Sequence, residues 1–338
     1  MLRRNAPYPG SPMPLLPPDS TETPDLTVII VSYNTREMTL EAVRSAIAET
    51  AETAMEIILV DNASRDGSAE AVAEAFPDVQ LIADGENHGF AKANNIAATR
   101  ARGRYLLLLN PDTVTLDGAL DKLMAFARAR PEAGIWGGRT LYGDRSLNPT
   151  SAWGRQTLWS LACRVSGLAV VRPDSELFNS EGYGGWDRSG IRAVDIVQGS
   201  FLLIRRELWE TLGGFDLTYV MYGEEADLCL RARAHGAQPL ASGEPTIIHY
   251  LGASSSLRSD KQILVLKARI TLTRHLPPWQ RPLARLLLRA WPLSRVLGAR
   301  ILAGVTRRQR YRDVAVSWGA VWAERKSWSA GYPINPNV

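Results

Sequence analysis

The chain of 338 residues lacks the features that mark several common protein classes. Its two cysteines, Cys163 and Cys229, provide neither a disulfide framework nor metal-ligand spacing, which fits a reducing compartment. Prolines follow the basic residues Arg3 and Arg4, where a signal peptide needs an apolar stretch. No uninterrupted apolar run approaches the length of a membrane-spanning helix. These absences predict a cytoplasmic protein.

Other absences narrow the choice of function. The segment 87–95 has no Gly-x-Gly-x-x-Gly and no Walker lysine motif, which argues against a dinucleotide enzyme or a P-loop NTPase. The net charge is +4, but the basic C-terminal part lacks a recognisable reader motif, so we expect no nucleic-acid partner. There is no internal repeat. A hydrophobic content of 45% is ordinary for a globular protein with a sizeable core.

From Leu26 onward, short apolar runs alternate with helical patterns. The runs are 26–31, 56–60, 79–82 and 105–109, and the helical patterns between and after them are 39–50, 69–76, 91–101 and 116–129. This alternation predicts an α/β fold with a parallel sheet and helices on both faces. Functional residues then belong at the carboxyl ends of the strands.

Three regions follow from composition. Residues 1–25 contain many prolines and are expected to form a disordered tail. Residues 26–258 form the predicted α/β domain, in which 140–190 is expected to consist of long loops and 195–204 of a strand. Residues 259–338 are predicted to be helical and basic.

Polar motifs close the first three predicted strands. A carboxylate such as Asp61 can accept the N3–H of uracil or thymine, and a helix that begins near Gly89 suits a phosphate. The alternative is that these motifs are polar turns that cap the following helices. The candidate nucleotide-binding residues are Ser32, Tyr33, Asn34, Asp61, Asn87, Gly89 and Lys92.

Acidic residues gather at two further places. Asp112 follows the fourth strand in Asn-Pro-Asp, and Glu224, Glu225 and Asp227 begin a helical run. Crowded carboxylates carry an electrostatic cost, so such a cluster usually has a task in base catalysis, metal binding or substrate binding. A structural role is the alternative in each case: Asp112 can form a Pro-Asp turn, and Asp227 can form an ion pair with Arg231, four positions later on the same helix.

Taken together, the motifs resemble those of the GT-A nucleotide-sugar glycosyltransferases of family 2, especially bacterial rhamnosyltransferase-like members. The matched segments occur in the family's order and cover about residues 26–256. They are Val31–Asn34, Asp61–Ser68, Asn87–Phe90, Asn110–Asp112, Gly213–Asp216, Glu224–Arg231 and His249–Ser254.

The resemblance implies how the donor is held. Asp61 corresponds to the residue that reads the pyrimidine. Asp112 resembles the last acid of the family's metal motif, although Asn110 replaces the first aspartate, and His249 resembles the second metal ligand. The implied cofactor is a divalent metal, Mg²⁺ or Mn²⁺. The implied donor is a dTDP- or UDP-sugar, with rhamnose favoured.

The resemblance also implies an inverting transfer to a glycan or lipid-linked glycan acceptor in cell-surface polysaccharide synthesis. Glu225 corresponds to the catalytic base, with Glu in place of the family's Asp. Glu224 and Asp227 would hold acceptor hydroxyls, Arg231 would orient the carboxylates, and Gly199 is assigned to the acceptor side.

The C-terminal region mixes arginines with leucine and tryptophan from Arg281 onward. Such a helix can lie on an anionic membrane surface at the inner face of the plasma membrane. It can also pack on the catalytic domain with its arginines in water, or form a homo-oligomer contact. Two rivals to the enzyme remain at this point: a sugar nucleotidyltransferase and a non-catalytic nucleotide-sugar-binding scaffold.

Overall fold

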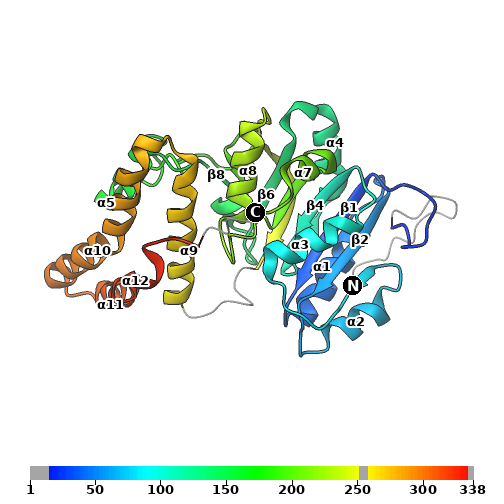
Figure 1. Ribbon diagram of the computed structural model, residues 1–338, viewed down its shortest axis with the longest axis horizontal. Helices are drawn as coiled ribbons and strands as arrows, with labels where there is room; N and C mark the ends of the chain where they lie inside the picture. The colour runs from blue at the N-terminus through cyan, green and yellow to red at the C-terminus, as the bar shows by residue number, and fades with distance from the viewer. Residues whose placement is uncertain (1–14, 251–257, 334–338) are drawn as a thin grey trace.

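The structure is a computed structural model that describes residues 15–250 and 258–333. It contains an α/β unit built on one large sheet and a helical unit beside it (Figure 1). The helix α9 (Arg258–Leu272) lies between the two units and contributes side chains to the cores of both.

The main path of the sheet has the strand order β3-β2-β1-β4-β11-β6-β12-β5. Strands β1 to β4 are mutually parallel, whereas β11 runs antiparallel to both of its neighbours and β5 runs antiparallel to β12. The bounds are β1 (Leu26–Ser32), β2 (Met55–Asp61), β3 (Gln80–Ile82), β4 (Tyr105–Leu109), β5 (Thr113–Leu116), β6 (Ile135–Leu141), β11 (Phe201–Arg205) and β12 (Leu240–His249).

Helices cover both faces of this sheet, which explains why its central strands are apolar throughout. In β1, Ile29 and Val31 face one core cluster, while Val28 and Ile30 face the other. One face carries α1 (Arg36–Ala48), α2 (Ser68–Ala75) and α4 (Ala119–Ala129), and the other carries α3 (Gly89–Arg100), α7 (Arg206–Leu212) and α8 (Glu224–Ala234). The predicted α/β architecture with a mostly parallel sheet is confirmed.

Two local expectations are corrected. Residues 113–116 form strand β5, because they pair with β12 at the edge of the sheet, and helix α4 begins only at Ala119. The segment 140–190 is not only loop. It contains β7 (Leu147–Asn148), β8 (Ala152–Trp153), α5 (Leu158–Ser166) and α6 (Leu168–Val171), and β9 (Ile191–Ala193) and β10 (Ile196–Val197) follow it.

The last residues of the expected disordered tail pack on the α/β unit. Leu15 and Leu16 are buried, and the Leu16 amide donates to the Met55 carbonyl over 2.7 Å. The Arg102 guanidinium donates to the Ser20 carbonyl over 2.6 Å and pairs with Glu56. Residues 15–25 therefore differ from the expectation, while residues 1–14 lie outside the described part of the chain.

The helical unit has a core of its own. Helix α5 packs against α10 (Arg281–Thr306), α10 packs against α11 (Gln309–Ala323), and α9 contacts α10, α11 and α12 (Arg325–Trp328). The buried side chains of this core include Leu161, Leu266 and Leu288. Trp328 is fully buried in this core, and its indole N–H donates to the Val321 carbonyl over 2.8 Å. No described helix is long and apolar enough to cross a membrane.

We predict that Trp328→Ala destabilises the protein by about 3–5 kcal/mol, because it leaves a large cavity in the helical core. Trp279→Ala is the matched control, since the Trp279 side chain is 74% exposed and its loss is expected to change stability by less than about 0.5 kcal/mol. Thermal unfolding of the two variants measures the difference. Equal shifts of the midpoint would contradict the described packing.

Candidate active site

The carboxyl ends of the parallel strands meet at one edge of the sheet and place Asp61 there. Asp61 is buried, and its Oδ2 accepts the Ser64 amide over 2.9 Å. Its Oδ1 is buried and has no hydrogen-bond partner among the described residues. Because a buried acceptor without a partner is costly, this oxygen is ready for a donor from a ligand.

The loop after β1 lies beside the loop after β2, but the Ser32 side chain, expected in the site, is buried elsewhere. Asn34 has a positive φ of 52° and accepts the Arg65 amide at its Oδ1 over 2.8 Å, which joins this loop to the one after β2. Ser32 does not point toward the site. Its side chain is buried beside Thr39, with 2.8 Å between the hydroxyl oxygens, because side chains alternate along a strand. The next side chain, Tyr33, is exposed.

The loop before α3 is shaped by hydrogen bonds from asparagine side chains. Asn87 accepts the Gly89 amide at its Oδ1 over 3.0 Å, and Gly89 has a φ of 70°, which favours glycine. Asn62 connects this loop to β2, because it donates to the Gly89 carbonyl and accepts the His88 amide. Lys92 is exposed on the first turn of α3. A helix N-terminus with a nearby cation suits a phosphate.

Asp112 and His249 are brought together as predicted. They are far apart in sequence, but β12 pairs with β5 so that His249 lies opposite Thr113. The Nε2 atom of His249 is 3.1 Å from Oδ1 of Asp112 and 3.4 Å from Nδ2 of Asn110. A carboxylate oxygen and an imidazole nitrogen are suitable donors for Mg²⁺ or Mn²⁺.

This pair supplies only part of a metal's coordination. Among the described residues, no group of three or more His, Cys, Asp or Glu side chains could hold a metal ion. A hard divalent ion that bridges two phosphates keeps waters and phosphate oxygens as ligands, so two protein ligands are sufficient. The residues present therefore fit a metal that is bound together with a diphosphate.

Gly199 lies where these elements meet. A Cβ atom placed on Gly199 would be 3.5 Å from Cβ of Glu225 and 3.6 Å from the Phe90 ring, which follows Gly89. The next residue, Ser200, accepts the Asn110 amide at its carbonyl over 3.2 Å. The Gly199–Ser200 segment therefore lies beside the start of α3, the loop that carries Asp112, and the start of α8.

Glu225 faces a cavity of about 1100 Å³, whereas Glu224 is not among its lining residues. Burial raises the pKa of Glu225, and backbone N–H groups at the start of α8 offset this only in part. Burial and the neighbouring charge of Glu225 raise the pKa of Glu224 well above its usual range. The expected contact of Glu224 with an acceptor is not supported by its position.

Asp227 does not have the predicted role. Its carboxylate is fully buried and accepts Arg231 Nε over 2.7 Å, Arg274 Nη2 over 2.6 Å and His275 Nε2 over 2.7 Å. Burial raises the pKa of Asp227, but the hydrogen bond from His275 and the charges of Arg231 and Arg274 outweigh it and hold the pKa well below its usual range. Asp227 is also not among the residues that line the cavity, so its position does not support a contact with acceptor hydroxyls.

Arg231 orients a carboxylate as predicted, but that carboxylate is Asp227. Its two remaining nitrogens donate to the carbonyls of Leu212 and Gly214 over 2.7 and 2.8 Å. Arg231 therefore connects α8 to the turn that follows α7.

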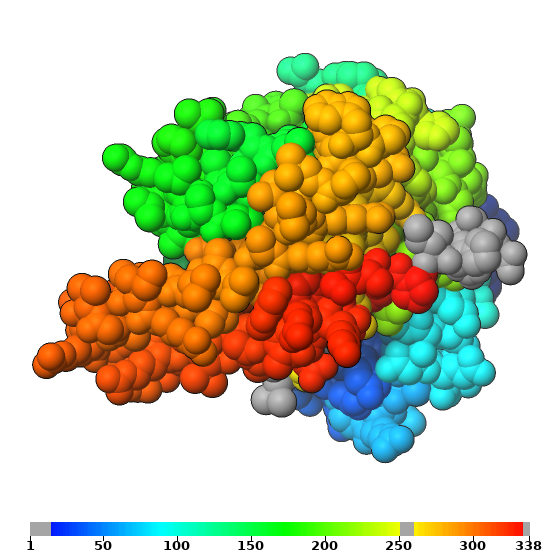
Figure 2. Space-filling model, turned by 60° about the vertical axis from the view of Figure 1, so that its left-hand side comes forward, coloured from blue at the N-terminus to red at the C-terminus, as the bar shows by residue number. Residues whose placement is uncertain are grey.

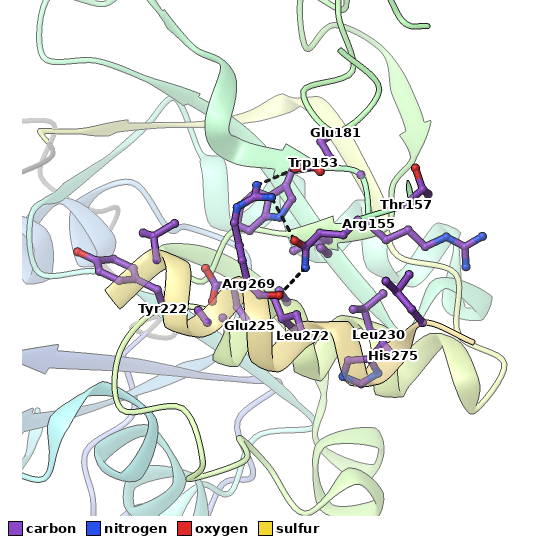
Figure 3. A pocket seen from close by; sticks show the side chains of 18 of the residues that line it. Trp153, Arg155, Thr157, Glu181, Tyr222, Glu225, Leu230, Arg269, Leu272 and His275 are labelled. Carbon is purple, nitrogen blue, oxygen red and sulfur yellow. Dashed lines mark hydrogen bonds and ion pairs between the residues drawn. The ribbon is translucent and has the colours of Figure 1, made fainter. Parts of the chain in front are cut away.

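The cavity is lined from both units of the fold (Figure 3). Trp153, Tyr222 and Glu225 come from the α/β unit, while Arg269 and His275 come from the helical unit. Arg269 donates to Gln156 and to Glu181. Burial raises the pKa of Glu181, but the charges of Arg269 and Arg164 outweigh this effect and lower the pKa to about 2.

Sequence reasoning missed several of these lining residues. Gln198 lines the cavity with an Oε1 atom that is buried and has no partner among the described residues. In the sequence, only its position beside Gly199 could have indicated a place in the site. Nothing in Thr273-Arg274-His275 marks these residues as partners of α8.

The loops after β1, β2 and β3, the pair of Asp112 and His249, and the cavity-facing Glu225 lie at the carboxyl edge of a mostly parallel sheet, an arrangement of the GT-A fold. The mannosyltransferase PcManGT of Pyrobaculum calidifontis, solved in complex with GDP-Man and Mn²⁺, has a TM-score of 0.56 at 19% identity over 96% of this chain and 91% of its own. S. aureus TarS 1–349 in complex with UDP-GlcNAc has a TM-score of 0.51 at 13% identity over 90% and 81%. At these identities the likeness shows the fold alone.

The family model for glycosyl transferase family 2 matches residues 27–210, and the chain belongs to that family. It is 28% identical over 247 residues to the O-antigen biosynthesis protein RfbC of Myxococcus xanthus, a match that covers 70% of this chain but only 18% of RfbC. It is 26% identical over 274 residues to the N-acetylglucosaminyl-diphospho-decaprenol L-rhamnosyltransferase of Mycobacterium tuberculosis, covering 76% and 87%. These relatives confirm the resemblance to rhamnosyltransferase-like members.

We predict that Asp227→Asn destabilises the protein by about 3–5 kcal/mol, because it removes the charge that Arg231, Arg274 and His275 share. The pKa of Asp227 is lowered in the folded state, so its stabilisation is present above the unfolded value of about 3.9 and is lost as the pH falls below it.

Urea unfolding at several pH values measures this effect. The control is Asp313→Asn, which changes an exposed aspartate that is bonded to Gln309. A loss for Asp227→Asn that is no larger than for the control would contradict the described ion cluster.

Proposed function

We propose that the protein is a metal-dependent inverting glycosyltransferase that transfers a sugar from a dTDP- or UDP-sugar to a lipid-linked glycan. The observation that carries the proposal is the position of Gly199, which lies beside both Phe90 at the start of α3 and Glu225, and precedes the residue bonded to Asn110. A donor, a metal and a base can therefore act on one reacting centre.

The donor nucleotide is assigned to the loops after β1, β2 and β3. The unpartnered Oδ1 of Asp61 accepts the N3–H of the pyrimidine. The N-terminus of α3 at Gly89, with Lys92 on its first turn, faces the negative charge of the diphosphate.

Asp112 and His249 hold the metal in this proposal. When bound, the metal supplies neutralisation of the negative charge that develops on the departing nucleotide diphosphate. His249 is oriented by Asp112 and Asn110, and its buried Nδ1 has no partner among the described residues.

Glu225 is the proposed base. Its carboxylate removes the proton of an acceptor hydroxyl while that oxygen forms a bond to the anomeric carbon. The bond from the anomeric carbon to the diphosphate oxygen breaks, the diphosphate carries away the electron pair, and the configuration inverts. The raised pKa of Glu225 brings it closer to neutral pH, where a base accepts a proton more readily and is still ionised.

The names of two relatives support the acceptor class and the sugar. One is an L-rhamnosyltransferase that acts on N-acetylglucosaminyl-diphospho-decaprenol, and the other is an O-antigen biosynthesis protein. We therefore place the chain in cell-surface polysaccharide synthesis, with rhamnose as the first sugar to test. Peripheral contact with the inner face of the plasma membrane follows from an acceptor of this kind.

The direct test is nucleotide diphosphate release by the purified protein from a panel of dTDP- and UDP-sugars, with Mg²⁺, Mn²⁺ or EDTA. Release from one donor that requires metal supports the proposal and names the donor. If no donor releases diphosphate and none binds in calorimetry, the transferase proposal is wrong.

We predict that Glu225→Gln lowers the rate of transfer by about 10²–10⁴ while donor affinity stays unchanged, because general base catalysis is lost. The control is Glu207→Gln, on the exposed first turn of α7. Wild-type transfer falls as the pH is lowered through the raised pKa of Glu225, since the protonated carboxyl cannot act as a base. Parallel loss of donor binding and transfer would rule out the base assignment.

We predict that Asp112→Asn lowers the affinity of the protein for Mn²⁺ at least about tenfold, because one charged ligand becomes neutral. The measurement is calorimetric titration of Mn²⁺ into the protein with bound nucleotide diphosphate, and donor hydrolysis as a function of Mn²⁺ concentration gives a second value. Asp144→Asn is the control, since Asp144 lies in an exposed turn beside Ser146. Unchanged metal affinity in Asp112→Asn would remove Asp112 from the metal site.

A further inference from the structure

Helix α10 carries an apolar face that its own unit does not cover. Trp279, just before the helix, is 74% exposed, and Leu286, Leu297, Ile301 and Val305 are 60%, 51%, 66% and 78% exposed. Leu283 and Leu293 are also exposed. We call Trp279 and the six helix residues the α10 stripe.

The stripe occupies one side of the helix. At 3.6 residues per turn, its six helical residues fall within an arc of about 120°. The buried residues of α10, among them Ala284 and Leu288, point to the opposite side, into the core of the helical unit. Figure 2 shows α10 and α11 (orange to red-orange) projecting beyond the rest of the molecule.

Helices α10 and α11 carry almost only positive charge. Residues 281–323 contain nine arginines and a single acidic residue, Asp313, although the whole chain has a net charge of only +4. Arg300 lies on α10, and Arg307 and Arg308 follow its end, all with exposed side chains. An apolar face with arginines beside it matches the interface of an anionic bilayer. A second copy of the same surface would bring arginines against arginines.

The stripe also begins beside the cavity that contains Glu225. Pro277 and Gln280 line that cavity, and the exposed Trp279 lies between them in the sequence. A tryptophan at this position suits the boundary between lipid and water, where one part of its ring is apolar and the other is polar.

We propose that the α10 stripe binds the surface of an anionic lipid bilayer and so presents the Pro277–Gln280 end of the cavity to an acceptor in the membrane. The presentation of the cavity to an acceptor rests on the proposed function, whereas binding to the bilayer follows from the exposed apolar side chains and the positive charge. The partner is the bilayer, not a particular lipid.

Flotation of the full-length protein with vesicles tests the inference. The vesicles contain phosphatidylcholine alone or phosphatidylcholine mixed with phosphatidylglycerol. We expect binding to the anionic vesicles that weakens with salt. Replacing two stripe residues, Leu297→Gln with Ile301→Gln, is expected to lower the affinity about tenfold or more. Replacing Arg300 and Arg308 with Gln is expected to lower it roughly fivefold for each arginine removed.

Matched controls lie on the α/β unit. Ile191→Gln changes an exposed apolar residue on β9, and Arg100→Gln changes an exposed arginine at the end of α3. Both are expected to bind vesicles like the wild type. Circular dichroism confirms that the variants fold, which is expected because all of the changed side chains are exposed.

Three outcomes overturn the inference. They are the absence of vesicle binding, binding that the stripe variants do not weaken, and a concentration-dependent dimer that Leu297→Gln with Ile301→Gln dissociates in the absence of lipid. Donor hydrolysis without vesicles is measured in parallel. If hydrolysis persists while vesicle binding fails, only the membrane surface is wrong. If vesicle binding persists while no donor is hydrolysed and none binds in calorimetry, only the proposed function is wrong.

Discussion

The buried carboxylate of Asp227 is the interaction on which the rest of the site depends. Removing a carboxylate from water costs several kcal/mol, and three cationic or hydrogen-bonding partners offset that cost here. Arg231 lies on the same helix, but Arg274 and His275 come 47 and 48 residues later, from the helical unit. The bonds of Asp227 therefore connect the start of α8 to the helical unit. Because Glu225 precedes Asp227 by two residues, the position of the proposed base depends on the same contact.

Helix α8 shows how environment separates similar groups. Glu225 and Asp227 are both carboxylates at the start of one helix, yet the pKa of Glu225 is raised and that of Asp227 is lowered. The difference arises from their partners. Glu225 faces the cavity with backbone N–H groups alone, whereas Asp227 points between the units toward two guanidinium groups and an imidazole. One carboxylate is suited to accept a proton, and the other is suited to remain ionised.

The alternation of apolar runs and helical patterns was sufficient to predict the α/β unit, and the rule for carboxyl ends placed Asp61 and Asp112 correctly. The contact between Asp112 and His249 required the resemblance, because the order of strands decides it and no local pattern reveals that order. The local ion pair of Asp227 with Arg231 was visible as an alternative, but its distant partners were not. The sequence did not reveal that the Ser32 side chain is buried beside Thr39, because the side-chain direction at a strand end changes with a single residue. Leu15 and Leu16 pack on β2 although prolines surround them, since composition does not record a long-range contact.

The cavity has walls from two units, which gives its ligand a second effect. Glu225 and Tyr222 belong to one unit, and Arg269 and His275 belong to the other. A molecule that touches both walls is bound only while the two units are docked. Its binding therefore stabilises the docked arrangement relative to any arrangement in which the units separate. The proposed acceptor, bound in this cavity, would thus be a reversible cross-link, and each turnover would remove it from the interface beside the proposed base.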